Sequence, residues 1–129
     1  MSYYFSKLID GMSFDAVVEK VIAALKAEGF GVLTEIDVAA TLKQKIGVEF
    51  RPYRILGACN PALAHRALTA EDKIGTMLPC NVIVQDIGNG RVEVAAINPL
   101  AAMEGVGNPD LAAIAAEVAG KLERVVTSQ

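Results

Sequence analysis

Residues 53–84, YRILGACNPALAHRALTAEDKIGTMLPCNVIV, decide how this chain folds. The apolar run that ends at Ala58 and the run Val82–Val84 are each typical of a strand. Between them, Asn60-Pro61 predicts a helix start, because Asn is a strong N-cap and Pro is favoured at the first helical position. The stretch also holds both cysteines and the only histidine of the chain. It therefore predicts two strands separated by a helix, with chemically distinctive residues at the strand ends.

The sequence after this stretch indicates an antiparallel sheet. Residues 82–87 and 91–97 are predicted strands, and Gly88-Asn89-Gly90 between them is a strong hairpin signal. The Asn-Pro pair recurs at 98–99 and 108–109, where we expect helix starts again. Residues 109–126 carry one apolar stripe and predict a long final helix. Residues 69–77 are expected to form a polar connection, and residues 101–107 a small-residue loop.

The sequence before this stretch predicts strands over residues 3–9 and 30–38 with a helix between them. That helix begins after Ser13, a good N-cap, and ends at Gly29, which supplies a left-handed stop. The alternation in residues 30–38 predicts one buried and one mixed face for the second strand. Residues 39–46 are expected to form a short, weak helix that stops at Gly47.

These elements predict a single α+β domain over residues 1–129, with a mainly antiparallel sheet and helices packed on one face. Two long helices with one apolar stripe each fit a single layer. Strands 82–87 and 91–97 are nevertheless apolar on both faces. An exposed apolar face of this size requires a cover, and we expect a second copy of the chain to provide it, in a homodimer.

Composition excludes several classes of function. The net charge of −3 and the lack of a Lys/Arg cluster argue against nucleic-acid binding. Although 53% of the residues are hydrophobic, no run reaches the roughly 18 apolar residues of a membrane helix. The N-terminal residues lack the layout of a signal peptide. With only two cysteines, these features predict a cytoplasmic protein without a disulfide framework.

The two cysteines allow three interpretations. Buried cysteines behave as small hydrophobic residues, so Cys59 and Cys80 fit a core at the strand ends. Cys59 also lies just before a predicted helix, whose N-terminus would stabilise a thiolate for redox chemistry or ligand binding. A disulfide is opposed by a reducing compartment. No metal site is expected, because Cys59, Cys80 and His65 are too few and show no CxxC or HExxH spacing.

The asparagines and two basic residues complete the candidate site. Asn60 is explained as a helix cap, whereas Asn81 precedes strand residues and either clamps the backbone or faces a ligand. Arg54 is interpreted either as an ion-pair partner of Glu35 or Glu49 or as an anion contact at a subunit boundary. His65 is expected on the exposed face of its helix.

The chain resembles the domain-of-unknown-function 302 family over nearly its whole length. The segments that carry the resemblance are GACNP at 57–61, LPCNV at 78–82 and GFGVLTEIDV at 29–38. The resemblance implies a single β-α-β(4)-α domain, related in shape to the TATA-binding-protein-like fold, and it implies dimers. It implies neither an activity nor DNA binding. It points again to Cys59, Asn60, Cys80 and Asn81.

The sequence thus favours a homodimer that binds a small molecule or a partner at the strand ends. The expected binding residues are Cys59, Asn60, Cys80 and Asn81, with Arg54 and His65 as further candidates. One alternative is a thiol-dependent redox protein or enzyme that uses Cys59 or Cys80, and another is a purely structural interaction module. The templates GxSxG, P-loop and GxGxxG are missing, so no catalytic residue and no cofactor is identified.

Overall fold

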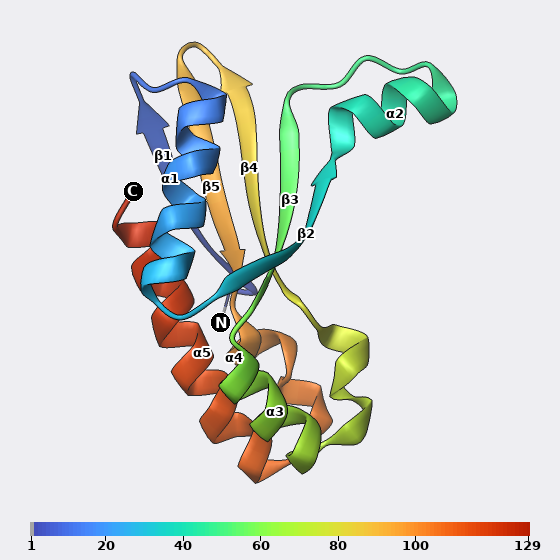
Figure 1. Cartoon of the computed structure of the whole chain (residues 1–129), viewed down its shortest axis with the longest axis vertical. Coiled ribbons are helices and arrows are strands. Elements are labelled where there is room, and N and C mark those ends of the chain that lie inside the picture. The colour runs from blue at the N-terminus through green and yellow to red at the C-terminus, as the bar shows by residue number, and fades with distance from the viewer. Residues whose placement is uncertain (1) are drawn as a thin grey trace.

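The computed structural model describes residues 2–129 and contains a five-stranded antiparallel sheet in the order β1-β5-β4-β3-β2 (Figure 1). The strands are β1 (Tyr4–Asp10), β2 (Gly31–Asp37), β3 (Tyr53–Cys59), β4 (Cys80–Gly88) and β5 (Arg91–Ile97). The predicted α+β class and the predicted antiparallel sheet are confirmed.

Five α-helices and two short 3-10 helices connect or follow these strands. They are α1 (Phe14–Ala27), α2 (Val38–Ile46), α3 (Pro61–Ala70), α4 (Pro99–Ala102), α5 (Pro109–Thr127), η1 (Asp72–Met77) and η2 (Glu104–Val106). Within the predicted polar connection over 69–77, residues 69–70 still belong to α3 and residues 72–77 form η1, and the predicted loop over 101–107 contains the end of α4 and all of η2. Within η1, Ile74 is only 2% exposed and belongs to the core.

The helices start where the sequence predicted. The side chains of Ser13 and Asn60 accept hydrogen bonds from the backbone N–H of Ala16 and of Leu63. Asn98 and Asn108 cap α4 and α5 in the same way, and Pro follows each of these three asparagines as the first helical residue. Side-chain capping satisfies N–H groups that have no partner inside the helix. The three Asn-Pro pairs therefore act as local start signals.

Helices α1 and α5 cover one face of the sheet (Figure 1). Helix α5 contacts β1 and β5, and α1 contacts β2 and β4. Every second side chain of the central strands is buried beneath them, including Val82, Val84, Val92 and Val94. The core thus lies between this helix layer and the sheet, as the apolar stripes indicated.

Strand β2 departs from the predicted alternation. It is an edge strand, and its register shifts between Val32 and Thr34. Because of this bulge, Val32 lies opposite Ala58 and Thr34 lies opposite Gly57, which leaves Leu33 unpaired and 68% exposed. The expected buried face was therefore wrong for this strand: Val32 is its only residue that is not exposed. A bulge adds one residue to a strand and redirects the side chains that follow it.

The hairpin between β4 and β5 turns through Asn89 and Gly90, whose φ values are +57° and +74°. Two positive φ values in a two-residue turn match the right-handed twist of the strands it joins. The hairpin prediction is confirmed. Within residues 2–129, no helix combines the length and the apolar character needed to cross a membrane.

Candidate functional site

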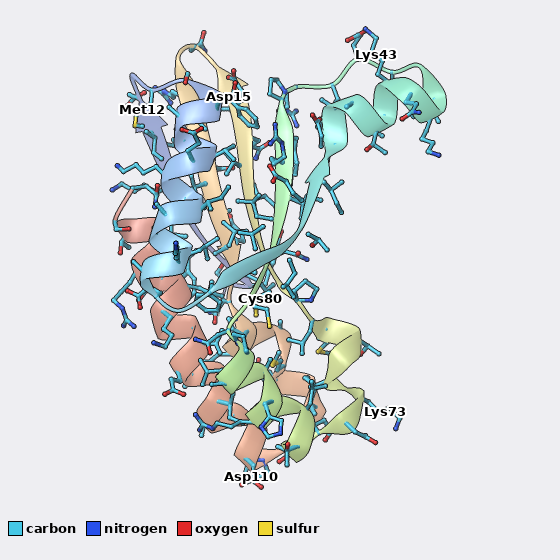
Figure 2. The ribbon with its side chains drawn as sticks, viewed as in Figure 1. Met12, Asp15, Lys43, Lys73, Cys80 and Asp110 are labelled. Atoms are coloured by element: carbon cyan, nitrogen blue, oxygen red, sulfur yellow. The ribbon has the colours of Figure 1, made fainter. Side chains whose placement is uncertain are left out.

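An apolar cavity of about 260 Å³ lies at the end of the sheet where β3 ends and β4 begins. Its walls come from these two strand ends and from helices α3, α4 and α5. Figure 2 shows Cys80 at this place, where the sheet meets the lower group of helices. The cavity therefore lies in the part of the chain that the sequence selected.

The two Cys-Asn pairs meet because β3 and β4 are adjacent and antiparallel. Ala58 lies opposite Cys80, and Gly57 lies opposite Asn81. The end of one strand therefore runs alongside the beginning of the other, and both cysteines line the same cavity. Pairing in the sheet brings together two motifs that are twenty-one positions apart in sequence.

Close packing around Gly57 holds these strand ends together. A Cβ atom at this position would lie 2.1 Å from Thr34 Oγ1 and 2.8 Å from Pro79 Cγ. Both distances are far below a van der Waals contact. The side chains of Thr34 in β2 and of Pro79 in the second motif can lie against residue 57 only because this residue lacks a side chain. The glycine of GACNP and the proline of LPCNV thus fit each other.

The environment of the Cys80 thiol favours its neutral form. Cys80 is 8% exposed, and this burial raises its pKa to about 11, with a smaller contribution from neighbouring Cys59. Cys59 is partly exposed, and both cysteines are free thiols. A buried thiol in apolar surroundings is a poor nucleophile at neutral pH. Cys80 therefore acts as an apolar, polarisable part of the wall.

The two asparagines differ in their placement. Asn60 lines the cavity while its Oδ1 accepts the 3.3 Å hydrogen bond that caps α3. Asn81 is exposed and points to the other face of the sheet, where it lies near Ile83 and Gln85. Successive side chains of a strand point to opposite faces, so Cys80 and Asn81 cannot face the same ligand in the cavity.

Arg54 and His65 both lie outside the cavity. Arg54 forms an ion pair with Glu35, which supports the ion-pair interpretation, and its guanidinium carbon lies 5.7 Å from the centre of the Phe14 ring. Glu49 pairs with Lys43 instead, at 3.0 Å. His65 is exposed on α3, as expected, and its side chain does not join the two cysteines.

The arrangement offers little for metal binding or acid–base chemistry. Among residues 2–129, no three His, Cys, Asp or Glu side chains are grouped so that they could hold a metal ion. The residues around the cavity include no Asp, Glu, Lys, Arg or His. General acid–base catalysis most often uses such a group within hydrogen-bonding reach of the substrate, so of the side chains around the cavity only the two cysteines could take that role. Most of the lining is apolar and can enclose an apolar surface.

Sequence reasoning missed the far wall of the cavity. This wall comes from the stretch 99–118. It faces the strand ends with Met103, between α4 and η2, and with Leu111, Ile114 and Val118 of α5. The apolar stripe of α5 was visible in the sequence, but it indicates only that the helix is covered on one side. Which strand ends it reaches depends on the path of the chain after β5.

Comparisons with known proteins agree with this fold. The family model described as "Domain of unknown function DUF302" matches residues 5–128. The crystal structure of an uncharacterized conserved DUF302 protein from Bacillus stearothermophilus has a TM-score of 0.90 and 29% sequence identity, over 98% of each chain. No functionally curated protein matches the chain significantly.

Proposed function

This chain belongs to the DUF302 family, and we propose that it is a binding protein whose cavity holds one small, uncharged, mainly apolar molecule. The observation that carries the proposal is the lining of the cavity. It contains aliphatic side chains, one phenylalanine, two thiols and a thioether, and a single asparagine as its only strongly polar side chain. The cavity residues of the proposed site are therefore Cys59, Asn60 and Cys80, together with the apolar walls.

The lack of charge in the lining selects the class of ligand. A carboxylate or ammonium group that enters an apolar site without a partner loses its hydration and gains nothing in return. An apolar molecule instead removes its own surface and that of the wall from water, which stabilises the complex by roughly 25 cal/mol per Å². The ligand that fits is thus uncharged in the part that enters.

The size of the cavity bounds the ligand. A dry cavity of roughly 150 Å³ lined by aliphatic side chains is enough to bind benzene. A volume of about 260 Å³ therefore accommodates a two-ring aromatic molecule or a short alkyl chain. Met103 and the two cysteines favour an aromatic ligand, because sulfur atoms make favourable contacts with aromatic rings.

Binding explains the site better than thiol chemistry does. An enzyme or redox carrier that uses Cys80 needs a thiolate there, and the raised pKa of Cys80 disfavours one. His65, the only histidine, lies outside the cavity and is not placed to accept a proton there. A purely structural module has no need of a cavity beside Cys59. These observations support a binding protein without catalysis of its own.

A matched pair of probes tests the proposal. Naphthalene and naphthalene-2-carboxylate share their rings and differ in one charged group, and their affinities can be compared by calorimetry or by NMR titration. We expect naphthalene to bind with one-to-one stoichiometry and the carboxylate to bind at least about tenfold more weakly, a difference of about 1.4 kcal/mol. Equal affinities, or no binding of naphthalene, would contradict the proposal.

A pair of variants on α3 controls for location. Ala64 lines the cavity, whereas Ala62 of the same helix is exposed and does not. Ala64→Phe fills part of the volume and should reduce naphthalene affinity by roughly tenfold or more. Ala62→Phe should leave the affinity unchanged. If the two variants behave alike, the naphthalene site is not this cavity.

A further inference from the structure

The three asparagines that cap helices, Asn60, Asn98 and Asn108, use one side of their amide groups in the same way. In each of them Oδ1 accepts a hydrogen bond from a backbone N–H in the first turn of the helix that follows. An asparagine amide also carries two N–H donors on Nδ2, which the cap does not use. The three asparagines differ in where these donors find a partner.

Two of the caps donate from Nδ2 to other parts of the protein. Asn98 Nδ2 donates to the backbone carbonyl of Ser2 over 3.1 Å. Asn108 Nδ2 donates to the carbonyl of Ala70 over 2.9 Å and to Glu71 Oε1 over 3.3 Å. An aspartate cap has no donor when ionised, so it could not form these bonds. At both positions the amide therefore ties a helix start to a distant segment.

Asn60 is the exception, and it is also the cap that lines the cavity. Within residues 2–129 its side chain forms one hydrogen bond, from the Leu63 N–H to Oδ1, and its Nδ2 forms none. The bond to Leu63 fixes which amide atom is the oxygen. The amide is half-buried, and a Cβ atom at Gly29 would lie only 3.0 Å from Nδ2. The free donor therefore lies beside Gly29, next to Phe30 in the cavity wall.

A free donor at an apolar cavity discriminates among uncharged ligands. A ligand that covers an N–H group removes it from water, and this costs free energy unless the ligand supplies an acceptor. A pure hydrocarbon supplies none. A carboxylate supplies one, but it brings a charge into a lining without any basic side chain. A neutral oxygen atom, such as that of a ketone, an ester or an ether, satisfies the donor without this cost.

We propose that Asn60 determines which apolar molecules the cavity prefers, because its Nδ2 donates a hydrogen bond to a neutral oxygen at one end of the ligand. This inference rests on the proposed binding function and narrows its ligand to a ketone, an ester or an ether with an apolar body. The cap holds the amide in place through Oδ1, so the donor is oriented before the ligand arrives. Such preorganisation lowers the entropy cost of binding.

Two probes of the same shape isolate this hydrogen bond. 2-Acetylnaphthalene and 2-isopropenylnaphthalene share their rings, and the C=O group of the first takes the place of a C=CH2 group in the second. Calorimetry or NMR titration gives the ratio of their affinities for each variant. Asn60→Ala removes the donor without adding a charge, and it should lower the preference for the ketone about fivefold, a difference of about 1 kcal/mol.

Two further variants keep the test interpretable. Asn60→Asp retains a strong helix cap but lacks the N–H donors, so it serves if the loss of the cap in Asn60→Ala weakens the fold. It should lower the ratio at least as much. Asn81→Ala changes the asparagine of the second Cys-Asn pair, which lies on the other face of the sheet, and should leave the ratio unchanged.

The side-chain amide protons of Asn60 report the same bond directly. Their NMR signals are identified by their loss in Asn60→Ala, and they should move further downfield with the ketone than with the hydrocarbon, because a hydrogen bond deshields the donor proton. If both probes bind and the folded Asn60 variants leave the affinity ratio unchanged, the role of Asn60 is overturned while the cavity remains a binding site. If neither probe binds the natural chain, the proposed binding function itself is contradicted, and this inference with it.

Discussion

The cavity at the sheet end and the open face, the side of the sheet that points away from α1 and α5, both carry apolar side chains, but the open face also carries Asn81, Gln85 and Glu93. Helices α3, α4 and α5 surround the cavity and give it a bounded volume, whereas nothing within residues 2–129 covers the open face. Hydrophobic burial is non-directional and scales with area. The cavity, walled by helices, suits a small molecule, whereas the open face is broad and carries only a shallow hollow beside Tyr4, Asn81 and Ile83.

The two surfaces meet at one strand pair. Cys80 faces the cavity and Asn81 faces the open side, and Gly57 lies opposite Asn81 with Thr34 and Pro79 packed against it. Adjacent residues of β4 therefore point to different surfaces. Substitutions at adjacent or matched positions can test this division, and their expected effects differ in size.

The largest effect is expected on the covered face. Val82 is fully buried and Ile83, the next residue, belongs to the open face. Val82→Asp puts an unpaired charge into the core and should lower the free energy of unfolding by more than about 4 kcal/mol, enough to unfold much of the protein. Ile83→Asp should keep the native circular dichroism spectrum. Urea titrations measure the loss of stability in each variant. Equal losses would contradict the placement of Val82 in the core and of Ile83 on the open face.

A smaller effect is expected from the Cys80 thiol at high pH. Its pKa is about 11 in the folded chain against 9.0 without the fold, so the folded state keeps the proton longer. This contribution to stability is complete below pH 9 and is lost between pH 9 and 11. The loss amounts to about 2–3 kcal/mol at about 1.4 kcal/mol per pH unit.

Denaturation of the natural chain and of two variants over this pH range isolates the Cys80 contribution. Cys80→Ala should remove the extra fall in stability. Cys59→Ala should retain most of it, because burial, the larger cause, is unchanged. Identical pH profiles for the natural chain and Cys80→Ala would show that Cys80 is not buried as described.

A single methyl group added at Gly57, where β3 pairs with both β2 and β4, should lower the stability of the fold. Gly57→Ala forces Thr34 or Pro79 to move and should cost about 2 kcal/mol of stability, in the range of overpacked cores. Gly31→Ala is the matched control in the neighbouring strand, since a Cβ there meets nothing within 4 Å. Adding Thr34→Ala to Gly57→Ala should restore part of the loss. A double-mutant cycle by urea titration measures this coupling.

The smallest difference is expected between the two asparagines. Asn60→Ala removes the cap of α3 and should cost about 1 kcal/mol. Asn81→Ala changes an exposed residue and should stay within about 0.5 kcal/mol. Thermal denaturation of the two variants measures the difference. A larger loss for Asn81→Ala would mean that its amide, and not that of Asn60, holds the strand ends.

Local signals predicted much of this fold from the sequence. The Asn-Pro caps, the Gly88-Asn89-Gly90 turn and the stop at Gly47 depend on neighbouring residues alone, and the structure confirms each. The side of the sheet that Asn81 faces was also implied, because it shares its parity with Ile83. The bulge at Leu33 left no such local mark; it shows only in the pairing of β2 with β3, where Thr34 lies opposite Gly57.

The site was predicted in its position but not in its walls. Antiparallel pairing brought Cys59 and Cys80 to one place, as expected for adjacent strands. The volume between them and α5 depends on how the chain after β5 crosses the sheet end, through residues 99–118. No pattern in the sequence specifies that path, so neither the cavity nor its apolar character could be foreseen.

The most direct test is to locate naphthalene on the protein by intermolecular nuclear Overhauser effects. The methyl groups of Ile114 and Val118 line the cavity, and those of Ile83 and Ala95 lie on the open face. We expect contacts from the naphthalene protons to Ile114 and Val118, and none to Ile83 or Ala95. Contacts to the open face alone would contradict the cavity as the binding site and show that its apolar walls are only core packing.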